Sequence, residues 1–181
     1  MRFAAILTDL DGVLVDSGDA VEAVWRDWAA ERGLDAEAVA RASHGVPSRE
    51  VIAAVAPQLD AAAEAERVDA HHAETGGEAL PGAAELLAAA PAGTLAVVTS
   101  CGAALAAARL RSAGLPEPAI LVTADAVRRV LDHHAARRLR AERAAGMTVW
   151  AVTTTHGEDE LREADRTAAD LAALLAPLGL A

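Results

Sequence analysis

Two carboxylates stand two residues apart near the start of the chain, at Asp9 and Asp11. An apolar run precedes them, from Phe3 to Leu7, and Gly12 follows them. A short apolar run bounded by polar and glycine residues is typical of a buried strand in a parallel sheet. Because extended backbone repeats every two residues, both carboxylates can face one side of the strand's carboxyl end, where open α/β sheets bind ligands.

Paired carboxylates repel each other and are costly to bury, so the pair needs an explanation. They could hold a divalent cation, or one could attack phosphorus while the other moves a proton to the leaving group. The alternative is a solvated turn with incidental acidic residues. An isolated Asp-x-Asp pattern does not decide between these interpretations.

The longer string around the pair is more specific. The residues from 9 to 17 read D-L-D-G-V-L-V-D-S and follow an apolar strand, which resembles the first motif of the haloacid dehalogenase superfamily. The resemblance implies that Asp9 is the nucleophile that becomes an aspartyl-phosphate and that Asp11 is the general acid/base. It also implies Mg²⁺, held by the Asp9 carboxylate and the Asp11 backbone carbonyl. True dehalogenases lack the second Asp, so Asp11 favours phosphate-ester chemistry.

Composition limits the class of protein. A length of 181 residues suits one domain, or a core with a small insert. A net charge of −11 argues against a nucleic-acid partner, because phosphate backbones are bound by clustered basic residues. All 16 basic residues are Arg, and the chain has no Lys. A single Cys excludes an internal disulfide, and no signal or membrane-spanning pattern is present, so we expect a cytoplasmic protein. The oligomeric state is not readable.

A block of helices follows the first motif. Apolar residues recur at helical spacing, with no strand pattern between residues 16 and 80, and predict four helices: 18–33, 36–43, 48–56 and 60–74. The block resembles the helical cap of the superfamily. The resemblance therefore implies a Rossmann-like α/β core over residues 1–15 and 81–181, with a cap over 16–80. It places His44 and Arg49, between two cap helices, near the substrate.

Other residues of the helical block have plainer interpretations. Trp25 and Trp28 lie on an apolar helical stripe and are expected in the cap core rather than against a ligand. The pairs His71–His72 and His133–His134 are poor chelators, because adjacent residues on a helix point about 100° apart. We expect them at solvated positions.

A second strand with a polar end is predicted from Thr94 to Thr99. The residues Thr99-Ser100-Cys101-Gly102 follow, and then a helix over 103–113. A hydroxyl at a strand end before a helix N-terminus can make an anion site, although an ordinary turn has the same pattern. After the Asp motif, the string resembles the superfamily's second motif, which implies that Thr99 and Ser100 hold the phosphate. Cys101 is expected to be a small filler.

The rest of the chain adds strands over 119–122 and 147–152 and a helix over 167–175. Most of the chain, residues 4–123 and 141–175, looks like the bacterial sugar-phosphate phosphatases of the superfamily. The resemblance implies Mg²⁺-dependent hydrolysis of small phosphate monoesters such as sugar or polyol phosphates, although a mutase would share these motifs.

The resemblance fails between residues 125 and 146. The family has there a catalytic Lys and a strand ending in an acidic pair that completes the Mg²⁺ site, whereas this stretch has 22 residues with neither feature. A βα unit with its next strand needs about 30 residues. We therefore expect one core βα unit to be missing, an Arg-rich helix over 132–145, and pairing of strand 147–152 with strand 3–8.

Two replacements for the lost groups are conceivable. Arg128 or Arg129 could take the place of the Lys, since Arg binds phosphate with different geometry. If the last strand shifts inward, Glu158 and Asp159 fall just beyond its carboxyl end and could approach the metal. A solvated surface charge is the favoured interpretation for each of these replacements. The alternative function is that of a truncated, inactive relative that at most binds a phosphorylated metabolite.

Overall fold

The structure, a computed structural model, describes residues 4–126, 146–154 and 157–180. It is an α/β fold with parallel sheets, as the sequence predicts. Strand β1 (Ile6–Thr8) pairs in parallel with β4 (Leu95–Val98), which pairs in parallel with β5 (Leu121–Val122). Helices α5 (Ala83–Ala89), α6 (Ala103–Ser112) and α8 (Ala172–Leu178) accompany these strands, and a short 3-10 turn (Ala124–Ala126) follows β5.

The last strand does not join this sheet, so the predicted pairing of strand 147–152 with strand 3–8 is wrong. Strand β6 (Trp150–Val152) pairs instead with β7 (Arg166–Ala168), in parallel. Residues of both β1 and β6 line one cavity, so a gap separates the two strands. The hydroxyl of Thr154, just after β6, reaches across and donates a hydrogen bond to the carbonyl of Gly12.

Strand β7 was not expected from the sequence. Its three residues are largely exposed and carry no apolar run, so the pattern gives no strand signal there. The tail helix consequently begins at Ala172 rather than at residue 167, and it continues through Pro177. The missing βα unit and the Arg-rich helix were predicted for a stretch that lies mostly outside the described residues.

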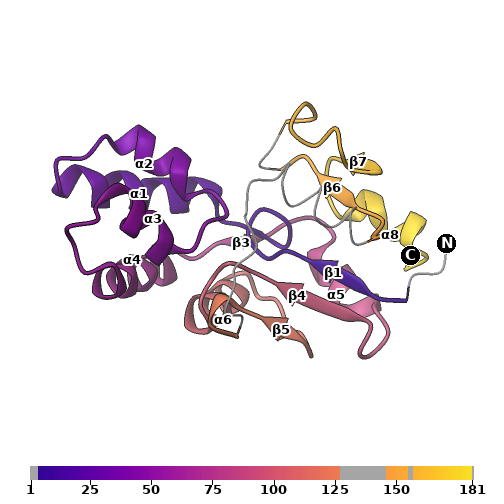
Figure 1. Ribbon diagram of the computed structural model, residues 1–181. Coiled ribbons are helices and arrows are strands. Elements are labelled where there is room, and N and C mark those ends of the chain that lie inside the picture. Colours follow the sequence, from indigo (N-terminus) through magenta and orange to yellow (C-terminus); the bar gives the residue numbers. More distant parts are fainter. Residues whose placement is uncertain (1–3, 127–145, 155–156, 181) are drawn as a thin grey trace.

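The helical part comprises α1 (Gly18–Glu31), α2 (Ala36–Ser43), α3 (Ser48–Val55) and α4 (Ala61–Thr75), close to the predicted bounds. Figure 1 shows it as a bundle set to one side of the sheets. It has its own hydrophobic cluster, in which Trp25 and Trp28 are buried edge to face with ring centroids 5.5 Å apart. The expected place of both Trp residues in this core is confirmed.

Two chain segments connect the helical part to the sheets. Strand β2 (Val15–Asp16) pairs antiparallel with β3 (Glu78–Ala79), so a short strand does occur within residues 16–80, contrary to prediction. A side chain at Gly77 would put a Cβ 2.5 Å from Cγ1 of Val15. Glycine at 77 therefore allows the two connecting segments to lie against each other.

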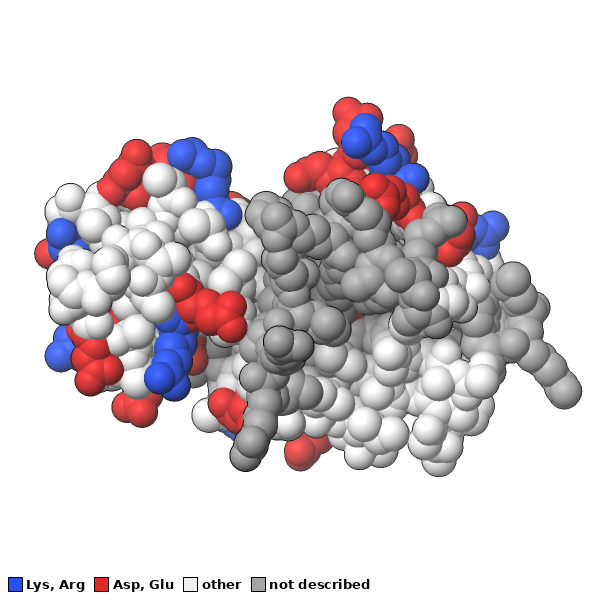
Figure 2. All heavy atoms as spheres, viewed as in Figure 1, with Lys and Arg blue, Asp and Glu red and all other residues white. Residues whose placement is uncertain are grey.

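Charge is distributed unevenly over the surface. In Figure 2 charged side chains gather on the helical part and around the loop that joins β6 to β7, while the white area at the lower right of this view is nearly free of them. None of the described helices has the length and apolar character needed to cross a membrane.

Candidate active site

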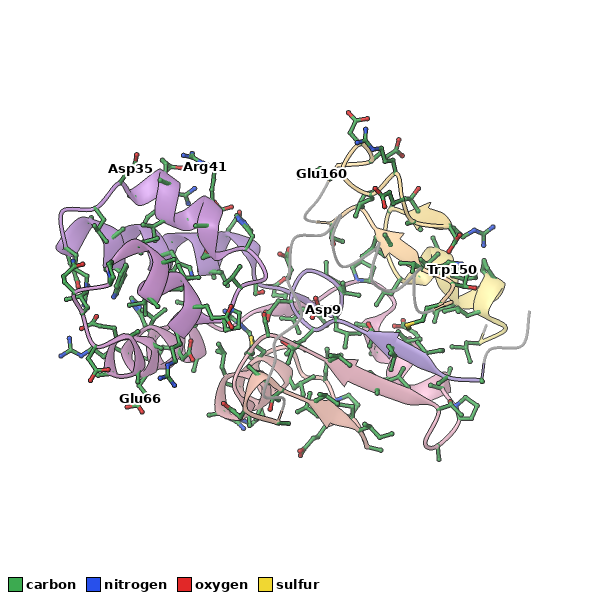
Figure 3. All side chains as sticks on the ribbon, viewed as in Figure 1. Asp9, Asp35, Arg41, Glu66, Trp150 and Glu160 are labelled. Atoms are coloured by element: carbon green, nitrogen blue, oxygen red, sulfur yellow. The ribbon has the colours of Figure 1, made fainter. Side chains whose placement is uncertain are left out.

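Asp9 and Asp11 lie directly after β1, where the first strand meets the helical part. Figure 3 shows Asp9 at this junction. The Asp9 carboxylate accepts a hydrogen bond from the backbone N–H of Leu10 at 2.8 Å. Both carboxylates line a cavity of about 370 Å³ that also reaches residues of the helical part. The structure thus brings the two acidic residues together in one cavity, as their spacing predicts.

Two hydrogen-bond donors and one cation surround the carboxylate of Asp11. The hydroxyl of Ser17 donates to Oδ1 at 2.5 Å and the thiol of Cys101 to Oδ2 at 3.0 Å. The guanidinium Nε of Arg109 lies 3.4 Å from Oδ1, an ion pair without hydrogen-bond geometry. An ionised carboxylate is an acceptor only, so the arrangement suits Asp11 in its charged form.

Arg109 has the longest reach of the groups around Asp11 that the sequence analysis did not assign to the site. Its side chain is 1 % exposed, and besides facing Asp11 it donates to the backbone carbonyl of Gly76. Arg109 lies between Leu105 and Leu110 on the buried face of α6. A charged residue on an apolar helical stripe is a signal for a buried ion pair, and it was present in the sequence.

Cys101 is more than a filler, because its thiol contacts Asp11. Burial first, and then the negative charge of Asp11, raise the pKa of the Cys101 thiol well above its ordinary value. The group therefore stays protonated near neutral pH and acts as a hydrogen-bond donor rather than as a nucleophile.

The two predicted phosphate-binding residues follow β4. Ser100 lines the cavity. Thr99 is buried, and its hydroxyl accepts a hydrogen bond from the N–H of Cys101 at 3.1 Å. The first N–H of α6, at Ala103, donates to Oδ2 of Asp125 at 2.7 Å. Part of the positive end of this helix is thus already used by an acidic side chain.

The helical part contributes polar residues to the same cavity. His44 lines it and contacts Glu22 at 3.0 Å, whereas Arg49 is exposed and is not among the lining residues. Ser48, Asp69 and His72 also line it. The expectation that His72 is solvated is wrong, because its side chain is 3 % exposed on the buried stripe of α4.

Two of these polar groups have shifted acidity. Burial, and then the charge of Arg109, lower the pKa of His72 to about 4, so its ring is neutral near pH 7. Burial raises the pKa of Asp69, although the hydroxyl of Ser48 opposes the shift by donating to Oδ1 at 2.5 Å.

Residues 6–130 match the family model for haloacid dehalogenase-like hydrolases. The chain is also 43% identical over 136 residues to hexitol phosphatase A of Escherichia coli (strain K12), a match covering 71% of this chain and 63% of that protein. The chain belongs to the haloacid dehalogenase-like hydrolase family. It spans less than two thirds of the length of this curated relative.

Solved structures agree with the fold of this family. A mutant of CbbY from Rhodobacter sphaeroides, in complex with xylulose-(1,5)bisphosphate, superposes with a TM-score of 0.77 at 22% identity, over 98% of this chain and 99% of the other. A hydrolase from Pseudomonas syringae superposes with a TM-score of 0.72 at 23% identity, covering 98% of each chain.

The metal site of the family is only partly represented among the described residues. Within the described part of the chain, no group of three His, Cys, Asp or Glu residues could hold a metal ion. Glu158 and Asp159 are exposed and do not line the cavity, so their suggested approach to a metal is not supported. Glu160 of the same loop lies well away from Asp9 in Figure 3. Arg128 and Arg129 lie outside the described residues.

Mg²⁺ remains compatible with the residues present. It commonly keeps several waters and takes one or two carboxylates together with substrate phosphate, rather than a full protein cage. The Asp9 carboxylate and the Asp11 backbone carbonyl lie at one strand end in the cavity and fit this limited role.

Proposed function

We propose that the chain hydrolyses small phosphate monoesters, namely sugar or polyol phosphates, through an aspartyl-phosphate. The observation that carries the proposal is the position of Asp9 and Asp11 together at the end of β1, in a cavity shared with Ser100 and with polar residues of the helical part. The similarity to hexitol phosphatase A supports a polyol phosphate as substrate.

In the proposed first step, a carboxylate oxygen of Asp9 attacks phosphorus and the bond from phosphorus to the ester oxygen breaks. Asp11 gives its proton to the departing oxygen, which leaves as an alcohol. In the second step, water attacks the aspartyl-phosphate, Asp11 takes a proton from it, and free phosphate and Asp9 are restored. Thr99 and Ser100 would hold the phosphate, and residues 16–80 would act as a cap over the core formed by 1–15 and 81–181.

Charge on the phosphate has to be compensated in this scheme. Mg²⁺ held by the Asp9 carboxylate and the Asp11 backbone carbonyl would supply several kcal/mol of electrostatic stabilisation. The hydrogen bonds from Ser17 and Cys101 and the nearby charge of Arg109 stabilise a charged Asp11 carboxylate, which is the form that accepts a proton in the second step. In the proton-donating step Asp11 carries a proton, so one donor has to release an oxygen.

The test is phosphate release from a panel of sugar and polyol monophosphates, with and without Mg²⁺, in the wild type and in Asp9→Asn. We expect turnover that needs Mg²⁺ and that falls by about 10³-fold or more in Asp9→Asn, because the nucleophile is lost. Asp19→Asn is a suitable control, because Asp19 lies in the first turn of α1 and is not among the lining residues. Equal release by wild type and Asp9→Asn would contradict the proposal.

A second candidate function is a relative that binds a phosphorylated metabolite without hydrolysing it. The absence of any Lys from the chain favours it, as does the lack of a third acidic metal ligand among the described residues. Losing one positioned electrostatic group typically costs a factor of about 10² to 10³ in rate. Calorimetric binding of a polyol phosphate without any release of phosphate would favour this candidate over the enzyme.

A further inference from the structure

One wall of the cavity is built by α3 and α4 of the helical part, and it is polar. Ser48 stands at the first residue of α3, and Asp69 and His72 lie three residues apart on α4. Residues at this spacing occupy one face of a helix. All three line the cavity that contains Asp9 and Asp11.

These side chains have unused hydrogen-bonding capacity. A carboxylate offers about four acceptor positions, and Ser48 uses one of them on Asp69. Nδ1 of His72 is buried and has no hydrogen-bond partner among the described residues. Buried polar atoms are normally satisfied, so His72, which lines the cavity, carries a polar atom that its surroundings among the described residues do not use.

The charge of this wall restricts what the ligand can be. Among the described lining residues, Arg109 is the one Arg, and its guanidinium already faces Asp11 and the Gly76 carbonyl. The wall itself therefore offers a carboxylate and neutral donors or acceptors, with no cation free for a second phosphate. A like charge placed opposite Asp69 would be repelled.

We propose that Asp69, with Ser48 and His72, selects the substrate by binding hydroxyl groups and by rejecting a second phosphate. The preferred substrates are then polyhydroxylated monophosphates rather than bisphosphates or esters with an apolar leaving group. The proposal rests on the proposed function, which puts the reacting phosphate at Asp9. It adds which groups bind the part of the substrate that lies away from that phosphate.

Equilibrium binding tests the proposal without requiring turnover. The Asp9→Asn protein is titrated with sorbitol 6-phosphate, phenyl phosphate, fructose 6-phosphate and fructose 1,6-bisphosphate by calorimetry. We expect at least one of the two hydroxylated monophosphates to bind about 10-fold or more tightly than phenyl phosphate, since a hydrogen bond to a charged group contributes that much. We also expect the bisphosphate to bind more weakly than fructose 6-phosphate.

Variants at Asp69 identify the residue responsible. In the Asp9→Asn protein, a second substitution, Asp69→Leu, is expected to reduce the preference for the hydroxylated ester over phenyl phosphate about 10- to 100-fold. Asp69→Asn in the same protein is expected to weaken the discrimination against the bisphosphate. Glu66→Gln is the matched control. It removes an acidic residue of α4 that is exposed and points away from the body of the protein in Figure 3, and both ratios should stay unchanged.

The outcomes separate the two proposals. Unchanged ratios in both Asp69 variants, or no hydroxylated ester bound better than phenyl phosphate, would overturn the role of Asp69. A wild-type protein that binds with the expected ratios but releases no phosphate would instead refute hydrolysis and leave the selection by Asp69 in place.

Discussion

At the residue scale, the arrangement around Asp11 depends on one buried cation. Arg109 comes from α6, faces Asp11 across the junction and holds the carbonyl of Gly76, where α4 ends. Its charge therefore lies beside two segments, the first motif at Asp11 and the end of α4 at Gly76. The replacement of the catalytic Lys by Arg128 or Arg129 lies outside the described residues, and Arg109 is a separate cation whose contacts are with Asp11 and the Gly76 carbonyl.

Arg109→Met should lower the free energy of unfolding by about 2–3 kcal/mol, since it leaves the Asp11 carboxylate without its ion-pair partner and the Gly76 carbonyl without its charged donor. Arg109→Lys should recover part of the loss. Urea unfolding followed by circular dichroism measures both. The control is Arg111→Met on the same helix, where the side chain is exposed and the change should stay within about 0.5 kcal/mol. Equal effects at 109 and 111 would contradict a buried ion pair.

The burial of His72 makes stability depend on pH. Its pKa is about 4 in the folded protein and 6.5 in the unfolded chain. Between these values the unfolded chain binds the proton more strongly, so stability is complete above pH 6.5 and falls as the pH drops towards 4. The full loss from this group is about 3 kcal/mol.

A pH series of unfolding free energies for wild type and His72→Phe isolates this contribution, because other groups titrate alike in both proteins. We expect the difference between the two curves to change by about 3 kcal/mol from about pH 7 to about pH 4. His71→Phe, one residue earlier and exposed, should follow the wild type. Parallel curves for His72→Phe and wild type would show that the ring has the same pKa in the folded and the unfolded protein, as a solvated ring does, and would contradict its burial.

At the element scale, periodicity located most helices and strands but not the partners of the strands. Each of α1, α4 and α6 has buried residues at helical spacing, among them Trp25, Val68 and Leu110. These helices lie where the sequence predicts them. Strand β6 is also found, yet it pairs with β7 rather than β1. Strand β7 has three largely exposed residues and no apolar run. The sequence therefore contains no sign that β7 exists or that β6 would pair with it.

Burial of single polar residues was readable in part. His72 continues the stripe of Ala65 and Val68 on α4, and this spacing distinguishes it from its exposed neighbour His71. The contacts of Asp11 were harder to predict from the sequence. Ser17, Cys101 and Arg109 come from three separate segments, which approach one another only in the packed fold.

The start of α5 requires a glycine. Gly82 has a φ of +86°, and a Cβ there would lie 2.7 Å from the carbonyl carbon of Leu171, just before α8. Gly82→Ala combines left-handed strain with a backbone clash and should cost about 2–4 kcal/mol in unfolding free energy.

Gly93→Ala is the matched control for Gly82→Ala. Its φ is +76°, but a Cβ there meets nothing within 4 Å. It should therefore show the strain alone, about 1–2 kcal/mol. Thermal or urea unfolding of both variants separates the two costs. Equal losses would show that α8 moves aside at Gly82 without penalty.

At the scale of the whole molecule, the described residues form two large hydrophobic clusters, which are joined by the two short segments that contain β2 and β3, and a small third cluster of Val149 and Leu161. The cluster of the helical part contains Trp25, Trp28 and Ile52, and the cluster around the sheets contains Leu10, Val97 and Leu174, among others. The two clusters have no buried residue in common, and the cavity that contains Asp9 and Asp11 is lined by residues of both parts. We therefore propose that residues 16–80 unfold as a unit of their own.

Fluorescence can observe the helical unit alone, because Trp150→Phe leaves Trp25 and Trp28 as the only Trp residues. In that background Ile52→Ala removes a fully buried side chain and should cost about 2–5 kcal/mol. The urea midpoint of Trp fluorescence should fall, while hydrogen-exchange protection of the β4 amides stays unchanged. Val97→Ala, fully buried in the sheet, should do the reverse. If each substitution shifted both probes equally, the two clusters would unfold together, and independent unfolding of residues 16–80 would be refuted.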